Sequence, residues 1–417
     1  MSTPTESYKE LQTSVTRTFE QLRRDRNLGV VYLLLAGVSA WALTGHDGTG
    51  TFNLDGGRSF GVAPTPLAWV VAGSLAVLGG VQLARGFGRW QSAVLAAVSV
   101  AFLFSLLAWA AAPKGFAFVG MLTQSITFST PFIFGALAGI MCERSGVVNI
   151  AIEGMLLAGA FTSVFVGSLT TFWVGVLAAM VVSALFAWLL AWLSIRFKVD
   201  QVIVGFFINF FVGGLTAFLD NRILQKNQTY NHVATLKPLK IPLLHSIPVI
   251  GPVLFVQTWF VYVGFALVFF LAWAFKGTRW GLRTRAVGEH PRAADTLGVN
   301  VNRMRYRNVI TAGAIAGFGG SWFTANVGQF RENITSGKGF IALAVVIVGR
   351  WTPIGALCGA LAFGFFDALQ AKLGFLKTGI PGEFIEMTPY LATIIVVAGF
   401  AGRTRPPKAS GQPYESQ

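Results

Sequence analysis

The chain has 417 residues, of which 54% are hydrophobic and only 12% are charged. An average soluble domain has roughly 25% charged residues, so this composition argues against a soluble fold. Four His and two Cys exclude a His-rich metal protein and a disulfide scaffold. The 32 basic and 17 acidic residues leave a net charge of +15, which is typical of nucleic-acid binding, of binding to a membrane surface, or of membrane topology.

Apolar stretches of the length that a membrane helix requires, roughly 20 residues, recur along the chain. They predict twelve candidate spans, at about 28–45, 66–84, 91–112, 117–141, 150–168, 172–195, 202–219, 258–275, 309–327, 340–350, 353–371 and 387–402. The tenth is too short to cross alone and adjoins Gly349 and Pro353, which indicates half of a broken helix. We therefore expect an all-α, polytopic transmembrane helical bundle in the cell membrane, with about 12 spans including broken or short helices.

The distribution of Lys and Arg predicts the orientation of this bundle, because loops on the cytoplasmic side retain most basic residues. With both termini inside, 22 of the 32 basic residues lie in cytoplasmic loops and tails, and 10, including Lys338, lie in outward loops. The expected topology is N-in/C-in. Because the basic residues are dispersed over short loops that contact membrane lipid, a nucleic-acid partner is excluded.

The longest inward connection, residues 276–308, holds eight basic and two acidic residues. Within it, Pro291 to Leu297 predicts a short helix, because Pro occupies the first turn, two Ala favour helix and Gly298 ends it. A two-turn helix is not stable alone in water, so it must dock onto its own protein or onto a partner. The simpler alternative is a basic loop that only orients the protein.

A second unusual segment, 143–161, places Asn149 and Glu153 in a mostly apolar run. Their spacing of four predicts that they share one helix face, and an ionisable group at membrane depth normally faces a cavity, a partner or a substrate path. The structural alternative is a carboxylate that closes a helix end or pairs with Arg144. Both interpretations remain open at this point.

Three further polar residues lie within the expected spans. Gln201 and Asn209 are eight apart and share a helix face, and Asp367 is a second buried acid. All three could line a substrate path, but hydrogen bonding between helices explains them equally well. Small residues at three-to-five spacing, such as Gly313, Gly317 and Gly320, predict close packing of helices.

Four strings together resemble one known family. They begin at Gly281 (Gly-Leu-Arg-Thr-Arg-Ala-Val-Gly-Glu-His-Pro-Arg-Ala-Ala-Asp-Thr-Leu-Gly), Gly313 (Gly-Ala-Ile-Ala-Gly-Phe-Gly-Gly), Gly337 (Gly-Lys-Gly-Phe-Ile-Ala-Leu-Ala) and Gly349 (Gly-Arg-Trp-Thr-Pro-Ile-Gly-Ala). The region resembles permease subunits of ATP-binding-cassette (ABC) importers. It looks closest to the nucleoside and simple-sugar group, which is related to branched-chain amino-acid permeases; the string Glu-Arg-Ser-Gly-Val-Val-Asn-Ile from Glu143 also resembles that group.

The resemblance covers about residues 116–417 and implies a division of the chain. Residues 1–27 form a cytoplasmic N-terminal tail, 28–115 an extra segment of about three spans that many relatives lack, and 116–402 the permease core. Residues 276–308 form a cytoplasmic coupling loop within the core, and 403–417 a C-terminal tail. The resemblance further implies ATPase contact by six residues of the loop: Glu289, Pro291, Arg292, Ala293, Ala294 and Gly298.

The resemblance also implies partners: an ABC ATPase subunit, a second permease subunit that is a different relative, and an extracytoplasmic substrate-binding protein. The sequence has no Gly-x-x-x-x-Gly-Lys-Ser/Thr phosphate loop and no metal cluster. We therefore expect no enzyme activity, metal or cofactor in this chain, and ATP on the partner ATPase. Nucleosides are the first expected substrate, ribose- or galactose-type sugars the second, and branched-chain amino acids the third. A stand-alone secondary transporter and an assembly protein remain as other classes.

Overall fold

The computed structural model describes residues 25–41, 48–54, 59–112, 115–376, 382–388, 390 and 405–415. The chain divides into two compact units. Unit 1 comprises Met1–Val119 and Phe375–Gly379, and unit 2 comprises Gly120–Gly374 and Ile380–Gln417.

Unit 1 is a small helical bundle with a short sheet. A helix at 25–41 packs with α2 (Pro64–Ala84) and α3 (Gln91–Ala111) around a core that includes Tyr32 and Leu75. The glycine-rich connection after the first helix contains β1 (Gly50–Asn53) and β2 (Ser59–Val62), which pair as an antiparallel hairpin. β3 (Phe116–Ala117) adds to β1 in parallel. Most of the small sheet therefore lies between the first two helices of the unit.

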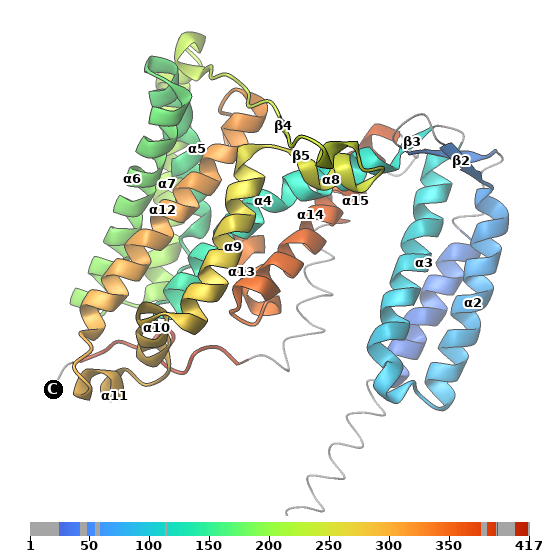
Figure 1. Cartoon of the computed structure of the whole chain (residues 1–417), viewed down its shortest axis with the longest axis horizontal. Coiled ribbons are helices and arrows are strands. Elements are labelled where there is room, and N and C mark those ends of the chain that lie inside the picture. Colours follow the sequence, from blue (N-terminus) through green and yellow to red (C-terminus); the bar gives the residue numbers. More distant parts are fainter. Residues whose placement is uncertain are drawn as a thin grey trace, which may run out of the picture. The chain divides into compact units, whose positions relative to one another are not determined.

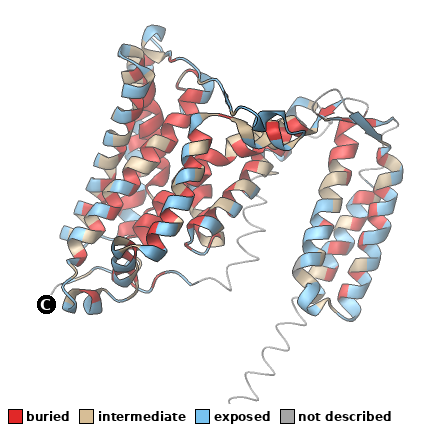
Figure 2. Cartoon of the chain, in the orientation of Figure 1, coloured by how far each residue is buried: buried red, intermediate tan, exposed pale blue. Residues whose placement is uncertain are grey.

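Unit 2 is built around α5 (Ile152–Leu169), which packs against α6 (Phe172–Ala191), α7 (Gln201–Leu219) and α12 (Val301–Val327). The other long helices of the unit are α4 (Phe118–Glu143), α9 (Trp259–Gly277) and α14 (Pro353–Leu376). α4 and α5 are buried over most of their length, whereas exposed apolar residues line the outer faces of α6 and α7 (Figure 2). An apolar outer face is what contact with lipid requires.

Close approach of the central helices depends on the small residues that the spacing pointed to. A Cβ on Gly317 would lie 2.4 Å from the carbonyl oxygen of Ala179 on α6, and one on Gly320 would lie 2.1 Å from that of Leu156 on α5. No side chain fits at either distance. The expected packing role of these glycines is confirmed.

Eight helices among the described residues are long and apolar enough to cross a membrane. Two of them continue as π-helical turns, η2 (Trp192–Arg196) after α6 and η3 (Asp220–Leu224) after α7. The all-α polytopic bundle is confirmed, while the number of spans and the N-in/C-in orientation stay predictions. The expected first and ninth spans correspond to the helix at 25–41 and to α12, whose first turns carry several Arg. The expected span at 387–402 lies almost entirely outside the described residues.

The expected half-helix is present as α13 (Lys338–Val348), an apolar helix of 11 residues. It ends in a tight turn before α14, in which Arg350 and Trp351 both have a φ of 53°. This left-handed conformation is uncommon for residues other than glycine. A Cβ on Gly349 would lie 2.4 Å from the backbone nitrogen of Ala356, so the turn also requires glycine there.

The connections of unit 2 place the coupling loop at one end. The long connection after α7 forms η4 (Gln228–Asn231), β4 (Leu239–Lys240), η5 (Leu244–Ser246), α8 (Ile250–Phe255) and β5 (Val256–Gln257). At the other end lie α10 (Arg279–Glu289) and α11 (Pro291–Thr296), beside the C-terminal residues (Figure 1). The short helix α15 (Gly382–Glu386) follows α14.

Candidate functional site: a buried frame and a coupling surface

The connection between α4 and α5, residues 144–151, runs through the interior of unit 2 without regular structure. Its backbone groups need partners, because buried unpaired N–H and C=O groups are costly. Two side chains of α7 supply them. Gln201 Oε1 accepts from the N–H of Val148 at 2.6 Å, and Asn209 Nδ2 donates to the carbonyl of Ile150 at 2.9 Å. Asn209 Oδ1 also accepts from the N–H of Gly154 at 2.8 Å.

Asn149 lies inside this connection rather than on α5. Its Oδ1 accepts from the N–H of Ala151 at 3.0 Å, and its amide nitrogen lies 3.5 Å from Cys142 Sγ. The expectation that Asn149 and Glu153 share a helix face is wrong, because α5 begins only at Ile152. The physical reason is that an Asn side chain bonded to the backbone two residues on competes with helix formation.

Glu153 caps the N-terminus of α13. Its Oε1 accepts from Thr335 Oγ1 at 2.6 Å and from the N–H of Gly337 at 2.9 Å, and its Oε2 accepts from the N–H of Gly339 at 2.6 Å. These N–H groups belong to the first turn of a helix, which has no internal partners and carries partial positive charge. The carboxylate therefore closes a helix end, as the structural alternative held, but the end is that of α13 rather than its own helix.

The second buried acid, Asp367 on α14, forms an ion pair with Lys338, the first residue of α13. The Asp367 side chain is 6% exposed and that of Lys338 is 24% exposed. Lys338 Nζ also lies 5.6 Å from the centre of the Phe132 ring. Lys338 is therefore a residue of α13 rather than of a loop, and its ammonium group lies against a buried acid, while the side of the membrane that it faces stays a prediction.

The coupling loop contains the two-turn helix that its residues predicted. α11 begins with Pro291 in the first turn and ends before Gly298, whose φ is 79° and whose N–H donates to the carbonyl of Asp295 at 2.8 Å. The two alanines differ, since Ala294 is buried with Val287 and Val301 while Ala293 is exposed. The helix thus docks on its own protein through one face and leaves the other free.

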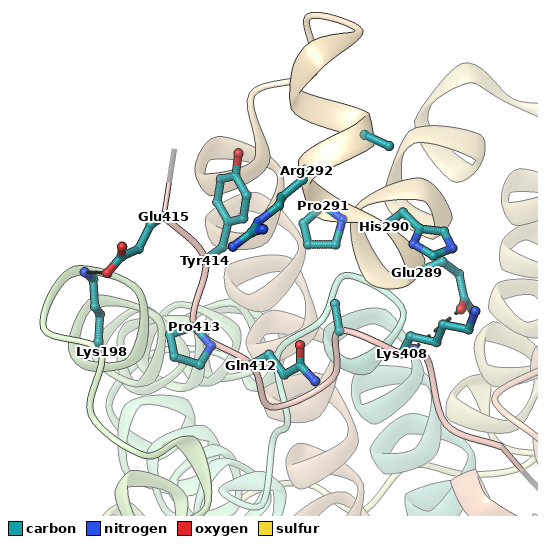
Figure 3. A pocket seen from close by; sticks show the side chains of 12 residues that line it. Lys198, Glu289, His290, Pro291, Arg292, Lys408, Gln412, Pro413, Tyr414 and Glu415 are labelled. Atoms are coloured by element: carbon teal, nitrogen blue, oxygen red, sulfur yellow. Dashed lines mark hydrogen bonds and ion pairs between the residues drawn. The ribbon is translucent and has the colours of Figure 1, made fainter. Parts of the chain in front are cut away.

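The C-terminal segment, residues 405–415, lies across α10 and α11 (Figure 3). The N–H of Ala409 donates to the carbonyl of Gly288 at 2.9 Å, and Tyr414 Oη donates to Asp295 Oδ2 at 2.6 Å. Glu415 pairs with Lys198, which follows α6. A groove of about 680 Å³ runs between this segment and α11.

A buried cation fixes the middle of the C-terminal segment. Arg305 of α12 is 1% exposed, and its Nη1 donates to the carbonyl of Gln412 at 3.0 Å. A guanidinium group requires hydrogen-bond acceptors when it is buried, and a backbone carbonyl of the segment supplies one. The segment is therefore attached to α12 as well as to the coupling loop.

A continuous set of contacts leads from the coupling loop to α13. A Cβ on Gly288 would lie 2.3 Å from the carbonyl oxygen of Arg144, so the end of α10 touches the start of the 144–151 connection. Arg144 Nε donates to the carbonyl of Trp351 at 2.9 Å. Trp351 Nε1 in turn donates to Glu143 Oε2. The coupling loop, the 144–151 connection and the turn after α13 are thus in direct contact.

Comparison with known proteins places the chain in a family. Residues 121–398 match the family described as branched-chain amino acid transport system / permease component. The guanosine ABC transporter permease protein NupQ of Bacillus subtilis is 41% identical over 302 residues, which are 70% of this chain and 94% of that protein. The chain belongs to this permease family. The match begins at residue 121, so nearly all of unit 1 precedes it.

Other relatives carry related names. The nucleoside ABC transporter permease protein NupC of Lactococcus lactis is 38% identical, over 70% of this chain and 96% of that protein. The putative glucose ABC transporter permease protein TsgC13 of Haloferax volcanii is 32% identical, over 68% and 92%. The same Bacillus and Lactococcus strains each hold a second, more distant match, named NupP and NupB. No solved structure matches the chain.

The permease has three residues of interest that the sequence interpretation did not select. Lys338 is the partner of Asp367, Tyr414 holds the C-terminal segment on α11, and Leu297 at the end of α11 is 84% exposed. The signal for Leu297 was available, because a large apolar residue next to Gly298 in a basic loop is unusual. Lys338 and Tyr414 depend on contacts 29 and 119 residues apart in sequence, which no local pattern reveals.

Proposed function

We propose that the chain is the permease subunit of an ABC importer that carries nucleosides across the cytoplasmic membrane. The observation that carries this proposal is the similarity to NupQ and NupC, which are 41% and 38% identical over 94% and 96% of their own lengths. The relative named for glucose is 32% identical. Its lower identity makes simple sugars the second candidate substrate.

We propose three partners for this permease. The first is an ABC ATPase subunit that binds and hydrolyses ATP, since this chain has no phosphate-binding loop of its own. The second is another permease subunit of a different sequence, which the pairs NupP and NupQ, and NupB and NupC, favour. The third is an extracytoplasmic substrate-binding protein that delivers the nucleoside.

The ATPase docks, in this proposal, on the free face of α11. Leu297 is 84% exposed there, and an exposed leucine at the end of a short helix is a suitable anchor for an apolar pocket. Arg292 and Ala293 are exposed in the groove beside the C-terminal segment. The buried Ala294 keeps the helix on its own protein, and the N–H of Gly298 closes the end of the helix on the carbonyl of Asp295. Pro291 in the first turn fixes where the helix starts, and Glu289, the last residue of α10, accepts from the N–H of Lys408 in the C-terminal segment.

Movement of the ATPase would reach the membrane core through the contacts of Gly288 with Arg144 and of Arg144 with Trp351. These contacts end at the turn after α13, which is the short helix whose other end Glu153 caps. A half-helix surrounded by protein is a suitable element to shift between inward and outward access, because its broken backbone requires no lipid-exposed polar groups. ATP binding would push α11, and hydrolysis would reset it.

The candidate path residues divide into two roles. Asn149, Gln201 and Asn209 are positioning residues, because their described hydrogen bonds hold the 144–151 connection. Glu153 positions α13 in the same way. Asp367 is the candidate that borders the path, together with Lys338.

Uptake of radiolabelled guanosine by a deletion strain that carries the complete importer tests the function. We expect uptake to require this permease and the ATPase, and to be inhibited by other nucleosides but not by ribose, galactose or leucine. Inhibition by a sugar and not by nucleosides would show that the substrate is a sugar rather than a nucleoside. If the tagged permease brought down no ATPase after gentle extraction, and uptake continued without one, the importer itself would be refuted.

A further inference from the structure

Beside the capped end of α13 lies a polar cavity of about 330 Å³, entirely within unit 2. Sites for small molecules are typically 300–1,000 Å³, so this cavity has the size of a single small ligand. Its lining consists of Ser336, Lys338, Ile341, Asp367, Gln370, Glu386 and Tyr390. Residues of α13, α14 and α15 contribute to it together with Ser336 and Tyr390, which places it at the start of α13.

The charges of the lining exclude one class of ligand. Lys338, the one cation among the lining residues, is already paired with Asp367, and Glu386 adds a negative charge that has no ion pair among the described residues. An anionic ligand such as a nucleotide would meet net negative charge there without a free partner for its phosphate. The cavity therefore favours a neutral or cationic molecule.

The hydrogen-bonding groups of the lining favour a neutral polar molecule over a simple cation. Within the described part of the chain, the amide of Gln370 has no hydrogen-bond partner and Glu386 has neither a hydrogen bond nor an ion pair. Tyr390 Oη donates to the carbonyl of Ser336 at 3.1 Å, which holds its ring at the cavity. A free amide, a free carboxylate and an aromatic ring together match a molecule that has hydroxyl groups and a flat heterocycle.

We infer that this cavity is a binding site for the neutral nucleoside within the permease, with Gln370 and Glu386 as the residues that hydrogen-bond it during passage. The inference rests on the proposed function, since the nucleoside class comes from there. The ribose hydroxyls donate to Glu386, the heterocycle exchanges hydrogen bonds with Gln370 and lies against Tyr390. The Lys338–Asp367 pair stays closed and fixes the wall, so a shift of α13 changes the cavity directly.

The test uses two conservative variants in the complete importer. Gln370→Leu removes the amide, and Glu386→Gln removes the charge while it retains the shape. Radiolabelled guanosine uptake is measured over a range of concentrations. We expect the maximal rate to fall roughly five- to tenfold in each variant, as loss of one hydrogen bond predicts. The half-saturating concentration should stay the same, because the substrate-binding protein that sets it is unchanged.

Matched controls separate a contact with the nucleoside from a structural effect. Glu383→Gln makes the same exchange at an exposed position of α15, and Gln228→Leu makes it at an exposed position of η4. Both should transport like the wild type, and all four variants should reach the same amount in the membrane and bring down the same amount of ATPase. A second readout is the ratio of guanosine to 2′,3′-dideoxyguanosine uptake, which should move toward one in Glu386→Gln.

The outcomes separate the two proposals. If the wild-type importer takes up no nucleoside, the proposed function fails before the cavity is tested with that ligand. If the wild type takes up guanosine but Gln370→Leu and Glu386→Gln keep the maximal rate and the ratio of the controls, the cavity is not on the path and the inference is overturned.

Discussion

The interior around Glu153 and the surface around α11 use polar side chains in opposite ways. Around Glu153, buried carboxylate and amide groups each hold the backbone of another segment, and Glu153 alone accepts three hydrogen bonds. Around α11, a six-residue helix is held by a small apolar cluster and by a C-terminal segment with few hydrogen bonds. Elements with few buried contacts open at low free energy, whereas buried networks open only with the core. The permease thus combines a firmly bonded interior around Glu153 with a weakly held surface helix, α11.

The largest expected effect comes from weakening the hydrogen bonds that Glu153 accepts at the start of α13. Glu153→Gln replaces one carboxylate oxygen by an NH₂ group that faces backbone N–H donors, so at least one donor loses its acceptor. We expect a loss of about 2–4 kcal/mol in the free energy of unfolding, as for other buried charged hydrogen bonds. The melting temperature of the purified permease in detergent measures it, with the exposed Glu383→Gln as the control. An unchanged melting temperature with no transport would instead make Glu153 a path residue.

The next effect separates stability from coupling. Leu297→Asp should leave the melting temperature unchanged, because the side chain is 84% exposed. It should reduce association with the ATPase roughly tenfold or more, as loss of an apolar anchor does at a protein interface. Co-purified ATPase and the stimulated hydrolysis of ATP measure this. Leu243→Asp, at a position that is 88% exposed, is the matched control. Equal association in both variants would refute docking on this face.

A smaller effect is expected from the C-terminal segment. Tyr414→Phe removes the hydrogen bond to Asp295, which costs about 0.5–1.5 kcal/mol in the free energy that holds the segment on α11. Hydrogen exchange of residues 405–415 should therefore become several times faster, while exchange in α5 should not change. Tyr306→Phe is the control, since the Tyr306 hydroxyl has no hydrogen bond in the described residues. Equal rates of hydrogen exchange in the two variants would show that the Tyr414 hydroxyl does not hold the segment on α11.

The smallest expected effect is a pH dependence of the same attachment. Partial burial and the neighbouring Asp295 raise the pKa of Tyr414 above its ordinary 10.0. The contribution of the Tyr414 hydroxyl to the free energy that holds the segment on α11 is therefore complete below pH 10, and it is lost as the pH rises through the raised pKa. Lys198 lowers the pKa of Glu415 below its ordinary 4.5. The contribution of the Glu415–Lys198 pair to holding the segment is therefore complete above pH 4.5, and it is lost as the pH falls through the lowered pKa.

A spin label on the exposed side chain of Gln412, in a background where the exposed Cys358 is replaced by Ala, measures this dependence. We expect constant mobility of the label between pH 5 and pH 10 and increased mobility outside these limits. A transition near pH 7 would show that other groups hold the segment.

Local patterns were sufficient where the physical cause is local. The helix at Pro291 follows from Pro, Ala and Gly at fixed positions, and α13 follows from an apolar stretch that is too short to span and ends at Gly349. The interpretation of Asn149 failed because a side chain bonded to its own backbone overrode a helical spacing. The ion pair of Lys338 was not predicted because its partner, Asp367, is distant in sequence.

The amino-acid sequence alone predicted that the chain is a bundle of apolar helices, that a basic loop carries a short helix, and that the core resembles nucleoside and sugar permeases. These conclusions depend on composition, spacing and motifs, which are local properties of the chain. Three features became visible only in the folded chain: Glu153 caps α13, Lys338 pairs with Asp367 beside a cavity, and the C-terminal segment lies on α11. The physical reason is that a buried polar group must find a partner, and which partner it finds depends on how distant helices pack.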